Sequence, residues 1–316
     1  MIELSWQPRF VREAVAVLAG SARHWTYISS RSVYARQDLP LASEAAEPHA
    51  PLDADEADAL EYGPAKAACE ALSVAALAGR LLRVRPGLIG GPGDPTGRST
   101  YWVTRAALAP TRPMLAPKPA GAPTQIIDVR DLAAWLLAAG ADGLTGAFNA
   151  VGPTMALADW IALSRLVGRH RSWIEWADPE LLLASGVEQF AGDRSLPLWI
   201  AEPSLRCFFL RDGSAAERQG LRHRPRVQML TDALVRAGAH QPAAPGPALT
   251  LEQEQGILQQ LAAWREHGAD KVPRAPRRET GQSRRALVSR EDSPARAGSR
   301  RAPSGAAESS ARSGRS

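Results

Sequence analysis

The chain has 316 residues, of which 45% are apolar and 22% are charged, enough for one large folded domain or two small ones. Its two cysteines lie far apart, with no second cysteine or histidine at ligand spacing, which excludes a disulfide scaffold and a structural zinc site. No apolar run reaches the ~20 residues that a bilayer requires, and no basic-then-apolar signal segment opens the sequence. We therefore expect a cytoplasmic protein without a metal ion or a membrane partner.

The excess of positive charge lies in the last part of the chain. Residues 271–316 contain 12 basic and four acidic side chains, a net of +8, whereas residues 1–270 carry a net of −3. The terminal segment has almost no large apolar side chains, so burial cannot offset its chain entropy. We predict a disordered basic tail, which is either a solvated extension or a weak, salt-sensitive binder of polyanions such as nucleic acid.

The first half of the chain alternates short apolar runs with amphipathic stretches, which is typical of parallel strands linked by helices. The fold class is therefore predicted to be α/β. In chain order we predict a helix at residues 8–18, a strand at 25–29, a long apolar helix at 62–79, strands at 81–85 and 125–129, a helix at 132–141 that Asp131 caps, and a strand at 148–151.

The composition changes beyond Gly152, where tryptophan-rich helical pieces and short extended runs, such as residues 207–210, precede a final amphipathic helix at residues 251–267. Aromatic side chains in such segments are more often core residues than ligand contacts. We predict three parts: a sheet domain at 1–152, a smaller substrate-binding lobe at 153–270 and the tail at 271–316.

Tyr62 and Lys66 stand at the start of the long helix. Residues four apart share one helical face, so the ammonium group lies beside the phenol and lowers its pKa from about 10 toward neutrality. Such a tyrosine acts as a general acid or base. The simpler alternative is a half-buried tyrosine beside a solvated lysine.

Ser29 and Ser30 follow the strand that ends at Ile28. In an open parallel sheet, ligands bind outside the carboxyl ends of the strands, so these hydroxyl groups face the expected crevice. Ser30 is then placed to hydrogen-bond a substrate oxygen while Tyr62 exchanges its proton. The simpler alternative is a serine that caps a turn.

A proline- and glycine-rich loop holds Gly87, Gly90 and Gly93 at a spacing that imitates a dinucleotide-binding loop. The prolines between them prevent the glycines from opening a helix, so we predict a rigid loop at the active site instead. For Asp94 and Arg98, which follow, we expect a solvent-facing ion pair.

Taken together, these segments resemble the extended short-chain dehydrogenase/reductase family, the NAD-dependent epimerase/dehydratase group. The resemblance runs from about residue 2 to residue 152 and more loosely to about residue 270. It is carried by YISSRSVYA at residues 27–35, YGPAK at 62–66, RPGLIGGP at 85–92 and IIDVRDLA at 126–133.

The resemblance implies NAD or NADP as the cofactor and a small hydroxyl or carbonyl compound, such as a nucleotide sugar, as the substrate. It implies a catalytic role for Ser30, which lies four positions before Tyr34, and the acid/base role for Tyr62. Lys66 would bind the nicotinamide ribose. The cofactor-binding residues implied are Tyr62, Lys66, Pro86, Gly87 and Leu88.

Members of this family begin with a strand, a glycine-rich turn and a helix that hold the dinucleotide pyrophosphate. This sequence opens on residues 1–6, which resemble the end of the fourth strand, so we expect an incomplete doubly wound, Rossmann-like sheet. Two hypotheses follow: a truncated reductase or epimerase, and a catalytically inactive remnant that binds a polyanion or RNA through its tail. The helices at 8–18 and 62–79 resemble the pair through which relatives form homodimers.

Overall fold

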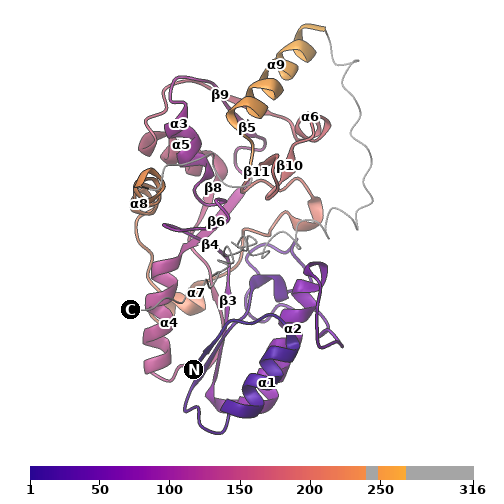
Figure 1. Ribbon diagram of the computed structural model, residues 1–316, viewed down its shortest axis with the longest axis vertical. Helices are drawn as coiled ribbons and strands as arrows, with labels where there is room; N and C mark the ends of the chain where they lie inside the picture. Colours follow the sequence, from indigo (N-terminus) through magenta and orange to yellow (C-terminus); the bar gives the residue numbers. More distant parts are fainter. Residues whose placement is uncertain (240–247, 268–316) are drawn as a thin grey trace, which may run out of the picture.

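The computed structural model describes residues 1–239 and 248–267 (Figure 1), so the predicted tail at 271–316 lies outside the described residues. A four-stranded parallel sheet, in the order β1-β2-β3-β7, forms the lower part of the molecule in Figure 1. Within the described residues β1 pairs with β2 alone and is one edge of this sheet. The strands are β1 (Ile2–Glu3), β2 (Trp25–Ile28), β3 (Leu81–Pro86) and β7 (Gly146–Ala150).

Helices cover both faces of the sheet because side chains along a strand point alternately to opposite sides. Tyr27 and Leu81 join the core on one face, together with Val11, Val15 and Cys69 from two helices. The neighbouring residues Ile28 and Leu82 join the core on the other face. The helices are α1 (Pro8–Leu18) and α2 (Tyr62–Leu77) on the first face, and α4 (Val129–Ala141) on the second.

A second and larger core lies above the sheet in Figure 1. It combines side chains from before and after Gly152, such as Trp102, Leu115, Trp160 and Trp199. The predicted domain boundaries stay a prediction. The elements around this core are β4 (Leu88–Gly90), β5 (Met114–Pro117), β6 (Pro123–Asp128), β8 (Thr154–Ala156), β9 (Ile174–Ala177), β10 (Glu188–Gln189), β11 (Ser195–Leu196), α3 (Tyr101–Leu108), α5 (Leu157–Val167), α6 (Pro179–Ala184), α8 (Arg226–Ala239) and α9 (Leu251–His267).

The predicted α/β class with a parallel sheet is confirmed, and so are the helices at 8–18 and 251–267. The helix at 132–141 is wrong at its start, because α4 begins at Val129 and its cap is Asp128, whose carboxylate accepts the Arg130 N–H at 2.9 Å. The extended run at 207–210 is also wrong, since residues 207–209 belong to a turn. Across the described residues, we find no helix with the length and apolarity needed to span a bilayer.

Candidate functional site

Tyr62 lies at the first position of α2, directly after a short 3-10 helix at Ala59–Glu61. Asp58 caps that short helix in a reciprocal arrangement with Glu61, which fixes where the chain turns into α2. The Tyr62 side chain is only 6% exposed, and its ring packs on Trp6 with 5.6 Å between the ring centroids. The candidate acid/base therefore sits in a rigid, largely water-excluded position.

Lys66 lies one turn further along α2 and is buried. Its ammonium group donates to the backbone carbonyl oxygens of Ile28 at 2.8 Å, Ser5 at 3.2 Å and Leu4 at 3.3 Å. The same group lies 5.8 Å from the centroid of the Tyr62 ring. These carbonyls follow β1 and end β2, so the positive charge is held under the carboxyl edge of the sheet, beside the tyrosine.

Ser30 caps the 3-10 helix Arg31–Val33, and its hydroxyl oxygen accepts the Ser32 N–H at 3.1 Å. This short helix packs against the first turn of α2 through Gly63, where a Cβ atom would stand 2.6 Å from the Ser32 carbonyl oxygen. Only glycine allows so close an approach. The structure thus brings the three predicted catalytic residues to the carboxyl ends of strands β1 and β2.

The predicted nicotinamide contacts, Pro86, Gly87 and Leu88, lie where β3 passes into β4. The Gly87 N–H donates to the Ala150 carbonyl oxygen at 3.2 Å, which ties this turn to β7. The side chain of Leu88 is buried in the large core. Leu88 can therefore meet a cofactor through its backbone only.

The expectation of a solvent-facing pair between Asp94 and Arg98 is wrong. Asp94 accepts hydrogen bonds from Thr96 and Ser99 within its own loop, at 2.6 to 3.1 Å. Arg98 is 5% exposed, and its guanidinium group lies 4.6 Å from the centroid of the Phe190 ring. Stacking on an aromatic ring replaces solvation for this charge.

A buried polar network around Tyr34 is the part of the site that sequence reasoning missed. Arg85 on β3 makes a bidentate pair with Glu70 on α2, at 2.9 and 2.7 Å, and also donates to the Tyr34 hydroxyl at 2.9 Å. The Tyr34 hydroxyl donates onward to the Asn149 side-chain oxygen at 2.6 Å. The sequence held one signal: Glu70 follows Lys66 by four residues and so shares its helical face.

Burial by itself raises the pKa of a carboxyl group, but Glu70 shows the opposite net effect. The hydrogen bonds and the charge of Arg85 outweigh burial and hold the pKa of Glu70 below its usual value. Burial raises the pKa of Tyr34, and Arg85 opposes that rise without cancelling it. Tyr34 is therefore a neutral hydrogen-bonding group at physiological pH rather than an acid or base.

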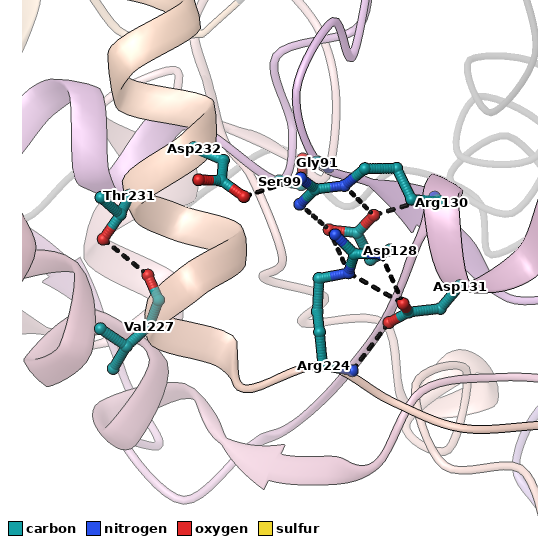
Figure 2. A network of polar contacts seen from close by, with 9 residues as sticks. All are labelled: Gly91, Ser99, Asp128, Arg130, Asp131, Arg224, Val227, Thr231 and Asp232. Carbon is teal, nitrogen blue, oxygen red and sulfur yellow. Dashed lines mark hydrogen bonds and ion pairs between the residues drawn. The ribbon is translucent and has the colours of Figure 1, made fainter.

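A second charge network joins α4 to α8, as Figure 2 shows around Asp128. Arg130 pairs with Asp128 at 2.7 Å and with Asp232 of α8 at 2.7 Å. Asp131, expected as a helix cap, instead pairs with Arg224 at 2.7 Å. Arg224, in the segment that precedes α8, also lies 3.5 Å from Asp128, so this segment is fixed to the end of β6 and to the start of α4.

Lys66 lies beside the carboxyl end of β2, and the turn at Gly87 follows the neighbouring parallel strand β3. An ammonium group and a backbone turn at the carboxyl ends of adjacent parallel strands are groups that can hold the nicotinamide end of a dinucleotide cofactor.

No sequence profile of a known protein family matches the chain, and no curated protein sequence matches it. Solved structures do match. UDP-N-acetylglucosamine 4-epimerase from Bacillus cereus superposes with a TM-score of 0.52 at 13% identity, covering 75% of this chain and 71% of that one. UDP-glucuronic acid 4-epimerase from Bacillus cereus, in complex with NAD, gives 0.50 at 13% identity over 73% and 67%.

A proposed epimerase from Burkholderia cenocepacia J2315 gives a TM-score of 0.52 at 16% identity, covering 72% of this chain and 69% of that one. At identities this low the likeness concerns the fold. The chain has the Rossmann-like α/β fold of NAD-dependent epimerases, which is the fold of the extended short-chain dehydrogenase/reductases.

Proposed function

We propose that this protein is an NAD(P)-dependent oxidoreductase or epimerase that acts on a small hydroxyl or carbonyl substrate, such as a nucleotide sugar. The observation that carries the proposal is the position of Tyr62 and Lys66 on the first turns of α2, with the short helix capped by Ser30 packed against the same turn. The fold shared with NAD-dependent epimerases supports it.

In this proposal Tyr62 transfers the proton and Ser30 orients the oxygen that gains or loses it. The Ser30 oxygen already accepts the Ser32 N–H, so its own hydrogen is the part of the hydroxyl that is directed to the substrate. The buried charge of Lys66 favours the phenolate form of Tyr62 and so assists removal of a proton from a substrate hydroxyl.

NAD or NADP, when bound, supplies the hydride chemistry. Tyr62, Lys66 and the backbone at Pro86, Gly87 and Leu88 would hold its nicotinamide end. For Lys66 to reach a ribose hydroxyl, its ammonium group must exchange one of its three carbonyl partners for that hydroxyl. Two of these carbonyls belong to Leu4 and Ser5, which follow β1, and the third belongs to Ile28, the last residue of β2.

The test is calorimetric binding of NAD(H) and NADP(H), followed by turnover of UDP-N-acetylglucosamine and UDP-glucuronic acid. Tyr62→Phe removes only the phenol, so we expect unchanged cofactor binding and a turnover at least 100-fold lower, the usual contribution of a general acid or base. Tyr101→Phe is the matched control, because it removes a buried hydroxyl that has no hydrogen-bond partner among the described residues. Full turnover by Tyr62→Phe would refute the catalytic assignment.

A homodimer through α1 and α2 is a further part of the proposal. Val17 and Val74 on the outer faces of these helices are 77% and 43% exposed, and Phe10 is 47% exposed. Apolar side chains gathered on neighbouring helices favour association. We expect a dimer by light scattering and a monomer for Val17→Asp; a monomeric native chain would contradict this part.

The alternative, a catalytically inactive protein that binds RNA or another polyanion through residues 271–316, follows from their net charge of +8. Such binding should weaken steeply with salt and disappear when these residues are deleted. A cytoplasmic location also stays a proposal. Cofactor binding that survives both the deletion and high salt would favour the enzyme.

A further inference from the structure

Ser30 stands at the start of a helix that has a single turn. This 3-10 helix, Arg31–Val33, is closed by the N–H groups of Val33 and Tyr34, which donate to the carbonyl oxygens of Ser30 at 3.1 Å and Arg31 at 3.3 Å. One turn does not hold itself, because it fixes several dihedral angles for few hydrogen bonds. The position of the Ser30 hydroxyl group therefore depends on the contacts that hold the ends of this turn.

Tyr34 holds the C-terminal end of the short helix. Its side chain is buried, and its hydroxyl group lies between two side chains of the sheet. The hydroxyl oxygen accepts from Arg85 at 2.9 Å, and the hydroxyl hydrogen is donated to the Asn149 side-chain oxygen at 2.6 Å. Arg85 and Asn149 are direct partners in the pairing of β3 with β7. The Tyr34 hydroxyl group thus attaches the end of the short helix to two neighbouring strands.

Asn149 and Arg85 make different demands on the group between them. The Nδ2 atom of Asn149 donates to the Asp212 carbonyl oxygen at 3.0 Å, so its Oδ1 atom faces Tyr34 and requires a donor. Arg85 can only donate and requires an acceptor. A hydroxyl group meets both demands at once, whereas a phenylalanine at this position would meet neither.

The ring of Tyr34 is also enclosed. The guanidinium groups of Arg85 and Arg211 lie 4.8 and 4.5 Å from the ring centroid, which is favourable for a cation beside an aromatic ring. Arg211 in turn donates to the Arg36 carbonyl oxygen and to the Gln37 side-chain oxygen, both at 2.6 Å. Tyr34 is therefore held by polar contacts at its ring as well as at its hydroxyl group.

The same contacts reach α2, the helix that carries the candidate acid/base. Arg85 makes its bidentate pair with Glu70 of α2 at 2.9 and 2.7 Å. Nearer the start of α2, the Ser32 carbonyl oxygen lies against Gly63, where a Cβ atom would stand 2.6 Å away. The short helix is thus attached to α2 at two points, directly at Gly63 and through Tyr34 and Arg85 at Glu70.

We propose that Tyr34 is a positioning residue that fixes the Ser30 hydroxyl group relative to the Tyr62 phenol. Two points of attachment prevent the short helix from turning against α2, whereas a single point would leave that rotation free. Tyr34 touches neither substrate nor cofactor in this proposal and acts through Ser30. The inference rests on the proposed function, in which Ser30 and Tyr62 act on the same substrate oxygen.

The first test compares Tyr34→Phe with Tyr101→Phe. Both variants lose one buried hydroxyl group, but that of Tyr101 has no hydrogen-bond partner among the described residues. Hydrogen exchange of the full chain, followed by mass spectrometry of residues 29–36, measures the amides of the short helix. We expect their exchange to be at least tenfold faster in Tyr34→Phe and to change less than twofold in Tyr101→Phe. Unchanged exchange in a folded Tyr34→Phe overturns the proposal.

Kinetics separate positioning from support of the fold. The substrates are UDP-N-acetylglucosamine and UDP-glucuronic acid, with NAD. We expect kcat to fall at least tenfold in Tyr34→Phe while KM changes less than twofold, because a displaced hydroxyl group weakens the transition state more than substrate binding. Tyr101→Phe should keep both constants. An unchanged kcat in Tyr34→Phe, or a loss confined to KM, overturns the proposal.

Gly63→Ala tests the other point of attachment and leaves the Tyr34 hydroxyl group in place. Its Cβ atom would displace the Ser32 carbonyl oxygen, so residues 29–36 should again exchange faster, and kcat should fall at least tenfold. Gly79→Ala is the matched control, because a Cβ atom there meets no other atom within 4 Å. Equal exchange in the two glycine variants overturns the proposal even if Tyr34→Phe does not fold.

Failure of the proposed function is distinguishable from failure of this inference. A native chain that turns over neither sugar nucleotide contradicts the proposed function. Faster exchange in Tyr34→Phe then still supports the attachment of the short helix by Tyr34, and unchanged exchange overturns it.

Discussion

The structure contains two buried Arg–Glu pairs, one beside the sheet and one in the large core, in which the pKa of the glutamate is shifted in opposite directions. Arg85 and Glu70 join β3 to α2, while Arg105 and Glu254 join α3 to α9. All four side chains are 2 to 6% exposed. The pKa of Glu70 is nevertheless lowered, whereas burial raises the pKa of Glu254 despite the opposing effect of Arg105.

The difference lies in how many charge-assisted hydrogen bonds each carboxylate receives. Glu70 accepts two from Arg85 and a third from Arg83 at 3.4 Å. Glu254 accepts one from Arg105 and one from the Leu115 N–H, because the other nitrogens of Arg105 donate to backbone carbonyls. A buried ion pair favours the charged form only when its hydrogen bonds outweigh the loss of water.

The largest expected effect is that of Glu70→Ala. This change leaves Arg85 buried without a carboxylate, which typically costs about 3–5 kcal/mol of unfolding free energy. Denaturant titration of the full chain measures the loss. Glu266→Ala, which changes an exposed glutamate outside the pair, is the control. A loss below about 1 kcal/mol of unfolding free energy for Glu70→Ala would show that the buried Arg85 does not depend on Glu70, contrary to the contrast drawn between the two pairs.

Glu254→Gln should cost less, about 1–2 kcal/mol, because the amide keeps an oxygen for Leu115 and burial already opposes the charge on Glu254. Denaturant titration under the same conditions gives the value. Glu70→Gln, which is the same chemical change, should cost more. If Glu254→Gln proved the more destabilising of the two, hydrogen-bond number would not explain the opposite pKa shifts.

The two glutamates should also differ in how they change the unfolding free energy with pH. Because the pKa of Glu70 is lowered in the folded chain, its carboxylate stabilises the fold fully above the usual carboxyl pKa of about 4.3. This stabilisation is lost as the pH falls through the lower pKa of the folded chain. The raised pKa of Glu254 has the opposite sign, since acidification favours its folded, protonated form. Unfolding free energies from pH 7 to pH 3 should therefore fall less steeply in Glu70→Gln and more steeply in Glu254→Gln.

Arg211→Met should have the smallest effect on stability, within about 1 kcal/mol. The variant loses two hydrogen bonds, but it also removes a buried charge with unused donors. Thermal and denaturant unfolding provide the measurement. A loss of about 3 kcal/mol of unfolding free energy would show that Arg211 stabilises the fold, as we expect of the paired arginines Arg85 and Arg105.

Local sequence patterns predicted the parallel sheet and the helices that cover it. The helix at 8–18 follows from its apolar periodicity and its first-turn proline, which are properties of neighbouring residues. The strands at 25–29 and 81–85 were predicted within one residue of β2 and β3 for the same reason. Local preference predicted Asp131 as the cap of the helix after β6, whereas in the structure Asp128 caps α4 and Asp131 pairs with Arg224.

The sequence by itself determined that Tyr62 and Lys66 share a helical face and that Ser30 follows a strand, because these are relations within one short segment. Only the tertiary structure decided that Arg85 pairs with Glu70 and that Arg98 packs on the Phe190 ring. It also decided that Arg211 donates to the Arg36 carbonyl oxygen. These contacts join residues up to 175 positions apart. Their pairing depends on which packing of the helices and strands best satisfies buried charges, and no local pattern encodes that choice.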